Sequence, residues 1–127
     1  MSYDVVIVDD DEIILFLHSK IIQAVGLTDS PKTFNSATNF LEFFDGLSKD
    51  RKSILLFLDI NMPVMDGWGL LDIIHQDNFD YDIQVVMVTS SVDSADKEKA
   101  ASYSKIIDFI EKPLNKEKLQ QLKLSHL

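Results

Sequence analysis

The chain of 127 residues contains no cysteine, which excludes disulfide bonds and thiolate chemistry. It has only four glycines and three prolines, which leaves little room for a flexible linker or a low-complexity tract. No apolar run is long enough to cross a bilayer, and the amino terminus lacks the basic region of a secretory signal. We therefore expect one globular domain over residues 1–127, located in the cytoplasm and outside the membrane.

Basic residues are also scarce, with 12 lysines and arginines against 21 acidic residues and a formal net charge of −9. Binding to nucleic acid phosphates needs a basic surface, so we expect no direct contact with nucleic acid. A chain this short and acidic is also expected to stand alone, without a DNA-binding or catalytic output domain. Its partners should then be proteins that bind its own surface.

Hydrophobic residues make up 46% of the chain, and many of them fall in four runs that each end in a polar residue. The runs and the polar residues that follow them are Val5–Val8 before Asp9, Ile54–Leu58 before Asp59, Val85–Val88 before Thr89, and Phe109–Glu111 before Lys112. Runs this apolar are typical of strands buried on both faces of a parallel sheet.

Stretches with helical spacing separate these strands. The first, from about Glu12 to Ala24, carries a predicted buried stripe of Ile13, Ile14, Leu17, Ile21 and Ala24. Ser36, Asp66 and Asn115 are candidate N-caps of later helices. A helix with few apolar residues is expected from about Asp93 to Tyr103.

A weak strand is predicted from Leu27 to Thr33, and Pro31 within it favours the edge of a sheet. The alternation of strands and helices then predicts an α/β protein with right-handed crossovers. Its expected fold is a flavodoxin-like five-stranded parallel sheet of order 2-1-3-4-5 with helices on both faces.

Ligands bind outside the carboxyl ends of the strands in such sheets, so Asp9, Asp10 and Asp59 should meet at one edge. An acidic triplet such as Asp9–Asp11 is by itself most often a solvated turn, and Asp11 also fits an N-cap. Carboxylates brought together repel unless a cation compensates them. Their hard oxygen atoms, with a backbone carbonyl nearby, favour Mg²⁺.

The same edge provides candidates for phosphoryl chemistry. Asp59 precedes a tight turn with Pro63 and Gly67, and its carboxylate can accept a phosphoryl group as an acyl phosphate. A strand-end threonine or a single lysine is usually structural or solvated. At this edge, however, Lys112 can pair with phosphoryl oxygens and Thr89 can donate a hydrogen bond to one of them. A cis peptide bond between Lys112 and Pro113 is compatible with the sequence.

At these residues the whole chain closely resembles the receiver domain of two-component response regulators, in a stand-alone form similar to chemotaxis regulators. The resemblance implies that Asp59 is the phosphoacceptor. It also implies that Asp10, Asp59 and the Asn61 carbonyl bind Mg²⁺ directly and that Asp9 contributes through water. Thr89 resembles the switch hydroxyl of the family and Lys112 its site lysine.

The implied partners are a sensor histidine kinase or a histidine phosphotransfer protein, and a downstream protein target. Phe109 resembles the switch aromatic but lacks the hydroxyl of a tyrosine. The fourth helix, last strand and last helix are the expected switching face, with Lys97, Lys99, Tyr103, Asp108 and Phe109. A homodimer through that face is left open. Asn61 and Ser91 are expected to influence the lifetime of the acyl phosphate. Residues 104–108 lack the Gly-Ala pair common before the last strand, so an unusual loop is expected there.

The resemblance implies a phosphoacceptor that catalyses only its own phosphotransfer and dephosphorylation and is not an enzyme. Three alternatives remain. An aspartate-nucleophile phosphatase, a true enzyme, would use Asp9 and Asp11. A degenerate module would only bind partners. Flavin or nucleotide binding is less favoured because no glycine-rich loop follows the first strand. The histidines, His18, His75 and His126, lack metal-binding spacing and are expected at the surface or its boundary.

Overall fold

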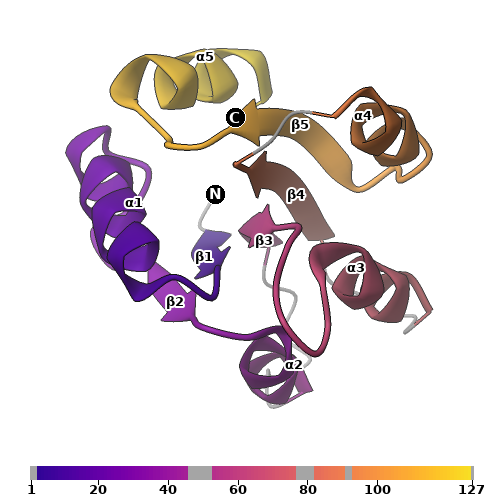
Figure 1. Ribbon diagram of the computed structural model, residues 1–127. Helices are drawn as coiled ribbons and strands as arrows, with labels where there is room; N and C mark the ends of the chain where they lie inside the picture. Colours follow the sequence, from indigo (N-terminus) through magenta and orange to yellow (C-terminus); the bar gives the residue numbers. More distant parts are fainter. Residues whose placement is uncertain (1–2, 46–52, 77–81, 91–92, 127) are drawn as a thin grey trace.

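The computed structural model describes residues 3–45, 53–76, 82–90 and 93–126. Its five strands form one parallel sheet in the order β2-β1-β3-β4-β5, which confirms the predicted topology (Figure 1). The strands are β1 (Tyr3–Val8), β2 (Lys32–Phe34), β3 (Ser53–Asp59), β4 (Asp82–Thr89) and β5 (Ile106–Glu111).

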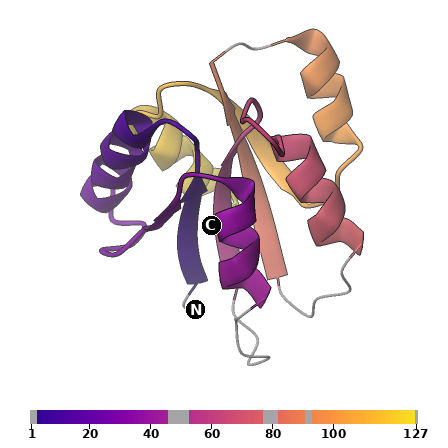
Figure 2. The same cartoon turned by 60° about the horizontal axis from the view of Figure 1, so that its bottom comes forward.

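Helices cover both faces of the sheet. They are α1 (Glu12–Ala24), α2 (Ala37–Asp45), α3 (Gly67–Gln76), α4 (Ser94–Ala101) and α5 (Lys116–His126). Figures 1 and 2 show α1 and α5 on one face and α2, α3 and α4 on the other. None of the described helices is long and apolar enough to cross a membrane.

The continuous apolar runs are explained by burial on both faces. Alternate residues of β3 enter two separate cores, with Leu56 and Leu58 facing α2, α3 and α4, and Leu55 and Phe57 facing α1 and α5. All four are at most 1% exposed. Full burial of such a side chain contributes about 1.5–3 kcal/mol, so a strand buried on both faces has no reason to alternate in polarity.

The predicted N-caps are confirmed by hydrogen bonds from backbone N–H groups to their side chains. Ser36 Oγ accepts from Asn39 at 3.1 Å, Asp66 Oδ1 from Gly69 at 2.8 Å, and Asn115 Oδ1 from Lys118 at 2.8 Å. Each cap satisfies a donor that the helix itself leaves without a partner.

The predicted stripe of α1 is wrong. Its buried residues are Leu15, His18 and Ile22, whereas Ile13 is 77% exposed and Leu17 is 41% exposed. Apart from a polar side with Glu12, Ser19 and Gln23, apolar residues cover the helix, so the sequence allows two stripes. Treating His18 as polar favoured the wrong one.

The second strand lies at the sheet edge, as predicted, but it covers Lys32–Phe34 instead of Leu27–Thr33. It begins just after Pro31, whose missing N–H cannot donate to a neighbouring strand. The last strand also departs from regularity. Val85 pairs with Ile106 and Val86 with Asp108, so Ile107 forms a bulge. An unusual loop was expected over residues 104–108, whereas residues 106–108 belong to β5.

Val64 provides the first stability prediction. Its φ is +70°, it is fully exposed, and the Met65 N–H donates to the Pro63 carbonyl at 2.8 Å, which forms a tight γ-turn. A β-branched residue is strained at this φ, whereas asparagine tolerates it. Val64→Asn should raise the free energy of unfolding by about 1 kcal/mol, measured by denaturant titration. Val64→Ala removes the same branched side chain but lacks the polar group that lets asparagine adopt positive φ, so it is the control. Equal stabilities of these two variants would show that the turn is not strained.

Candidate functional site

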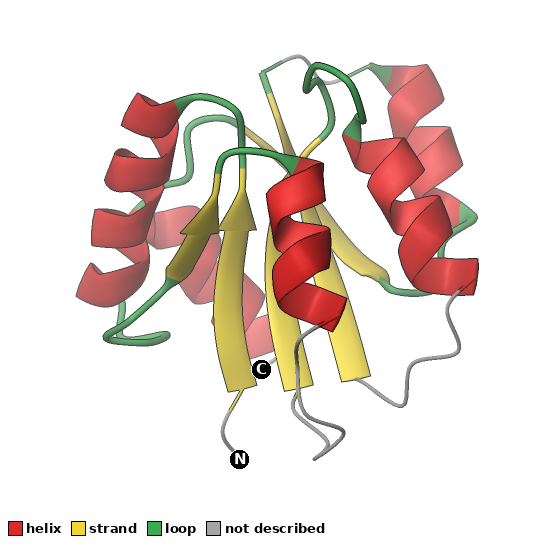
Figure 3. Cartoon of the chain, turned by 90° about the horizontal axis from the view of Figure 1, so that it is seen from below, coloured by secondary structure: helices red, strands yellow, loops and turns green. Residues whose placement is uncertain are grey.

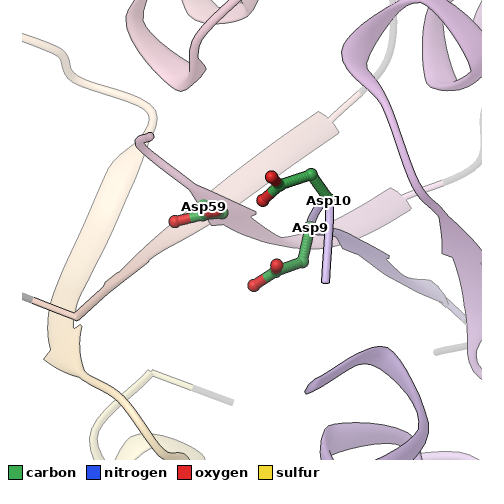
Figure 4. Close-up of side chains that lie close together, drawn as sticks. All are labelled: Asp9, Asp10 and Asp59. Atoms are coloured by element: carbon green, nitrogen blue, oxygen red, sulfur yellow. The ribbon is translucent and has the colours of Figure 1, made fainter. Parts of the chain in front are cut away.

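Three carboxylates meet at the carboxyl edge of the sheet. Figure 3 shows the strands running in one direction, and Figure 4 shows Asp9 and Asp10 after β1 beside Asp59 at the end of β3. One oxygen atom from each side chain lies within 4.8 Å of the others. β1 and β3 are neighbours, and Val8 pairs with Leu58, so the residues that follow them arrive together. The predicted acidic cluster is confirmed.

Lys112 reaches this cluster from the end of β5. Its Nζ lies 2.7 Å from Asp9 Oδ2 and 3.3 Å from Asp59 Oδ1. Its backbone N–H donates to the Thr89 carbonyl at 2.7 Å, which continues the pairing of β4 with β5. The Lys112–Pro113 peptide bond is cis. The sequence-predicted lysine and threonine therefore lie at the same edge as the acidic residues.

Burial raises the pKa of Asp59 from 3.8 to about 6, and the charge of Asp9 adds to this effect while Lys112 opposes it. Burial disfavours the charge of Lys112, but its bonds to Asp9 and the charges of Asp59 and Asp9 outweigh it and raise the pKa of the lysine. Among the described residues of the cluster, three carboxylates face one ammonium. This group has an excess of negative charge that a second cation can neutralise.

The donor set fits Mg²⁺. It consists of hard carboxylate oxygens on two adjacent strand ends, and it opens into a pocket that Asn61 and Ser90 also line. Magnesium binds through a few carboxylates and retains several waters, so an open acidic pocket suits it better than a closed cage.

The raised pKa of Asp59 predicts a pH effect on stability without Mg²⁺. Between its ordinary value of 3.8 and about 6, the folded protein binds a proton that the unfolded chain has released. The free energy of unfolding should therefore fall as pH rises through this window, by about 1–3 kcal/mol. Asp59→Asn removes this titration and should become more stable than the parent near neutral pH. Denaturant titrations from pH 4 to pH 7 test this, and parallel curves for the two proteins would contradict it.

Gly67 holds the loop after β3 against the nucleophile candidate. Its N–H donates to the Ile60 carbonyl at 2.8 Å, and a Cβ atom at this position would lie 2.5 Å from the Asp59 carbonyl oxygen. Any larger residue would have to displace the backbone of Asp59. The glycine therefore permits a close approach, beyond the role in a tight turn that the sequence indicated.

Comparisons with known proteins agree with this geometry. The family model "response regulator receiver domain" matches residues 5–123. The chain belongs to the response regulator receiver domain family.

Solved structures support the assignment. A two-component response regulator from Cytophaga hutchinsonii is 27% identical, with a TM-score of 0.83 over 95% of this chain and 93% of that one. A response regulator receiver protein from Dyadobacter fermentans is 30% identical, with a TM-score of 0.83 over 97% of both chains. A comparison with curated proteins finds no match. The family consists of signalling phosphoacceptor domains, and the match spans nearly the whole length of this receiver domain.

Three of the remaining predicted site residues, Thr89, Phe109 and Asn61, lie in the part of the receiver domain that the structure describes. Thr89 is fully buried at the end of β4, and Phe109 is partly buried against the core that faces α2, α3 and α4. Asn61 is exposed and lines the acidic pocket. Ser91 lies outside the described residues.

Asp11 and His18 have structural roles in α1. Asp11 lines the acidic pocket, but its Oδ1 accepts from the Ile13 N–H at 2.9 Å as the N-cap of α1. His18 is only 1% exposed, so its predicted surface position is wrong. Its spacing from Leu15 and Ile22 matches one helical face and was the signal that sequence reasoning missed.

Proposed function

We propose that this receiver domain accepts a phosphoryl group on Asp59 from a phosphohistidine of a sensor kinase or phosphotransfer protein. The observation that supports this most is the position of Asp59, at the end of a central strand between two further carboxylates and Lys112. In the transfer, an Asp59 carboxylate oxygen bonds to phosphorus as the phosphorus–nitrogen bond breaks. The electron pair of that bond returns to the imidazole.

Asp10, Asp59 and the Asn61 carbonyl would bind Mg²⁺ directly, and Asp9 would contribute through a water molecule. When bound, the ion neutralises charge on the transferring phosphoryl oxygens. Lys112 provides a second positive charge beside Asp59, where the Asp9 carboxylate already fixes its ammonium. Thr89 would donate its hydroxyl hydrogen to a phosphoryl oxygen once the acyl phosphate forms.

The exposed side of α1 is a suitable surface for the phosphodonor protein. Ile13 and Phe16 are 77% and 66% exposed, and Ile14 and Leu17 line the same pocket as Asp59. An apolar surface next to an acidic pocket can hold a partner by burial while its phosphohistidine enters the pocket. The side of α1 that the sequence wrongly assigned to the core thus becomes part of this proposal.

Phosphorylation would then alter the face made by α4, β5 and α5. It replaces one negative charge with about two and adds strong acceptor atoms, which attract Thr89 and Lys112. The structure describes every residue of α4, and among them Ala100 alone is buried. The helix therefore has little apolar contact with the core to resist a shift. Lys97, Asp108 and Phe109 line a shared pocket on this face that could receive a downstream protein.

A homodimer through the face made by α4, β5 and α5 remains a second option. A location in the cytoplasm stays a prediction. The acyl phosphate lifetime is expected to depend on Asn61 and Ser91. The phosphatase alternative has less support because the Asp11 carboxylate that it would use, although it lines the acidic pocket, already accepts backbone N–H groups as the cap of α1.

Incubation with a small phosphodonor such as acetyl phosphate tests the proposal. The intact protein should gain one phosphoryl mass in the presence of Mg²⁺, and hydroxylamine should remove it, as expected of an acyl phosphate. Chelation of Mg²⁺ should prevent the gain. A protein that binds Mg²⁺ but never incorporates phosphoryl groups would instead support the module that only binds partners.

A further inference from the structure

The strongest unassigned feature is the buried ring of His18 in α1. It is 1% exposed and lies on the side of the helix that packs against the second core, together with Leu15 and Ile22. α1 and α5 contact each other on this face of the sheet (Figure 1), and the chain between β5 and α5 passes beside them. A buried imidazole needs a polar partner, so its position calls for an explanation beyond filling space.

That partner is the backbone of the segment that carries Lys112. The Leu114 N–H donates to His18 Nε2 at 3.2 Å, across 96 positions of sequence. Because Nε2 accepts, the ring proton is assigned to Nδ1. Burial lowers the pKa of His18 to about 4, with Asp9 opposing this shift and Lys112 adding to it, so the ring is neutral near pH 7 and remains an acceptor.

The backbone of residues 111–114 is held from three sides. The Lys112 N–H donates to the Thr89 carbonyl at 2.7 Å, and the Lys118 ammonium donates to the Glu111 carbonyl at 2.9 Å. The bond to His18 attaches Leu114, two residues after Lys112, to α1. The sheet therefore fixes the backbone at Lys112 itself, and His18 fixes it two residues later at Leu114.

We infer that His18 is a positioning residue for phosphoryl transfer, because its hydrogen bond to Leu114 keeps the Lys112 ammonium aimed between Asp9 and Asp59. This inference rests on the proposed function. His18 itself does not bond to the reacting atoms in this arrangement. It acts through the backbone, and its acceptor atom matters more than the volume of its ring.

Glutamine and methionine separate these two properties. Both have similar length, but only the glutamine side chain carries an acceptor that can replace Nε2. With acetyl phosphate at saturating Mg²⁺, His18→Gln should label within a few-fold of the parent. His18→Met should label on the order of ten- to a hundredfold more slowly, since displacement of a catalytic group by about 1 Å has effects of this size. Ser19→Ala removes a hydrogen bond from the same helix, from Ser19 Oγ to the Leu15 carbonyl at 2.7 Å, and should label like the parent.

Amide hydrogen exchange at Leu114 provides a readout that does not depend on labelling. The Leu114 amide should be protected in the parent and in His18→Gln, and should exchange faster in His18→Met at a temperature where all three proteins are folded. Fast exchange in the parent would overturn the inference even if no variant folded. Equal labelling by the glutamine and methionine variants would also overturn it. A parent protein that never labels would instead contradict the proposed function, and the inference would fall with it.

Discussion

Asp59→Asn is expected to lower phosphoryl incorporation at least about a thousandfold, because an amide lacks the nucleophilic oxygen that forms the acyl phosphate. The substitution preserves the shape of the side chain and removes a buried charge, so the fold should be retained and the protein should be more stable without Mg²⁺. Intact-mass spectrometry after incubation with acetyl phosphate and Mg²⁺ measures the effect. Loss of phosphoryl incorporation in a variant with a higher free energy of unfolding would show that Asp59 has a chemical role and not merely a structural one.

Asp11→Asn is the matched control for this experiment. It removes a neighbouring carboxylate, yet asparagine is as good an N-cap as aspartate, so α1 should begin as before. This variant should label at the rate of the parent. If Asp11→Asn abolished phosphoryl chemistry and Asp59→Asn retained it, the phosphatase alternative would replace the proposed function.

Lys112→Met is expected to slow labelling by about a hundred- to a thousandfold while Mg²⁺ binds at least as tightly as before. The ammonium offsets charge on the transferring phosphoryl oxygens, and loss of one such preorganised group typically has an effect of this size. Its removal also leaves Asp9 and Asp59 without a cation that now lies within 3.3 Å of both, which should favour binding of the metal. Calorimetric Mg²⁺ titration and labelling rates measure these opposite changes.

Lys116→Met is the control for charge. Lys116 lies exposed in α5, and its substitution removes the same formal charge as Lys112→Met. It should change neither quantity appreciably. Weaker Mg²⁺ binding in Lys112→Met would show that the lysine maintains the shape of the acidic pocket. Unchanged labelling in that variant would show that Lys112 has no role in the transfer.

The predictions that were confirmed depend on local patterns in the sequence. Apolar runs such as Ile54–Leu58 identified strands buried on both faces, and short-range caps such as Ser36 and Asp66 marked the starts of helices. Alternation of strands and helices, together with the edge position expected for the weak second strand, predicted the sheet order, because right-handed crossovers leave few other arrangements. The acidic cluster followed, since parallel strands bring their carboxyl ends to one edge.

The buried side of α1 was not predictable in this way. Apolar residues occur on both of the competing faces of α1, so periodicity could not distinguish the face of Leu15 and Ile22 from that of Ile13 and Leu17. The start of β2 also depended on its neighbour, because register in a short edge strand is set mainly by pairing with β1.

The sequence by itself determined the fold class, four of the strand ends and the residue types of the acidic pocket, because hydrophobic burial and chain connectivity act on local patterns. Only the tertiary structure decided that Lys112 contacts both Asp9 and Asp59, and that His18 holds Leu114 from across 96 positions of sequence. These contacts depend on distances of a few ångströms between segments far apart in the chain. Such distances are set by packing of the whole core, which no local pattern encodes.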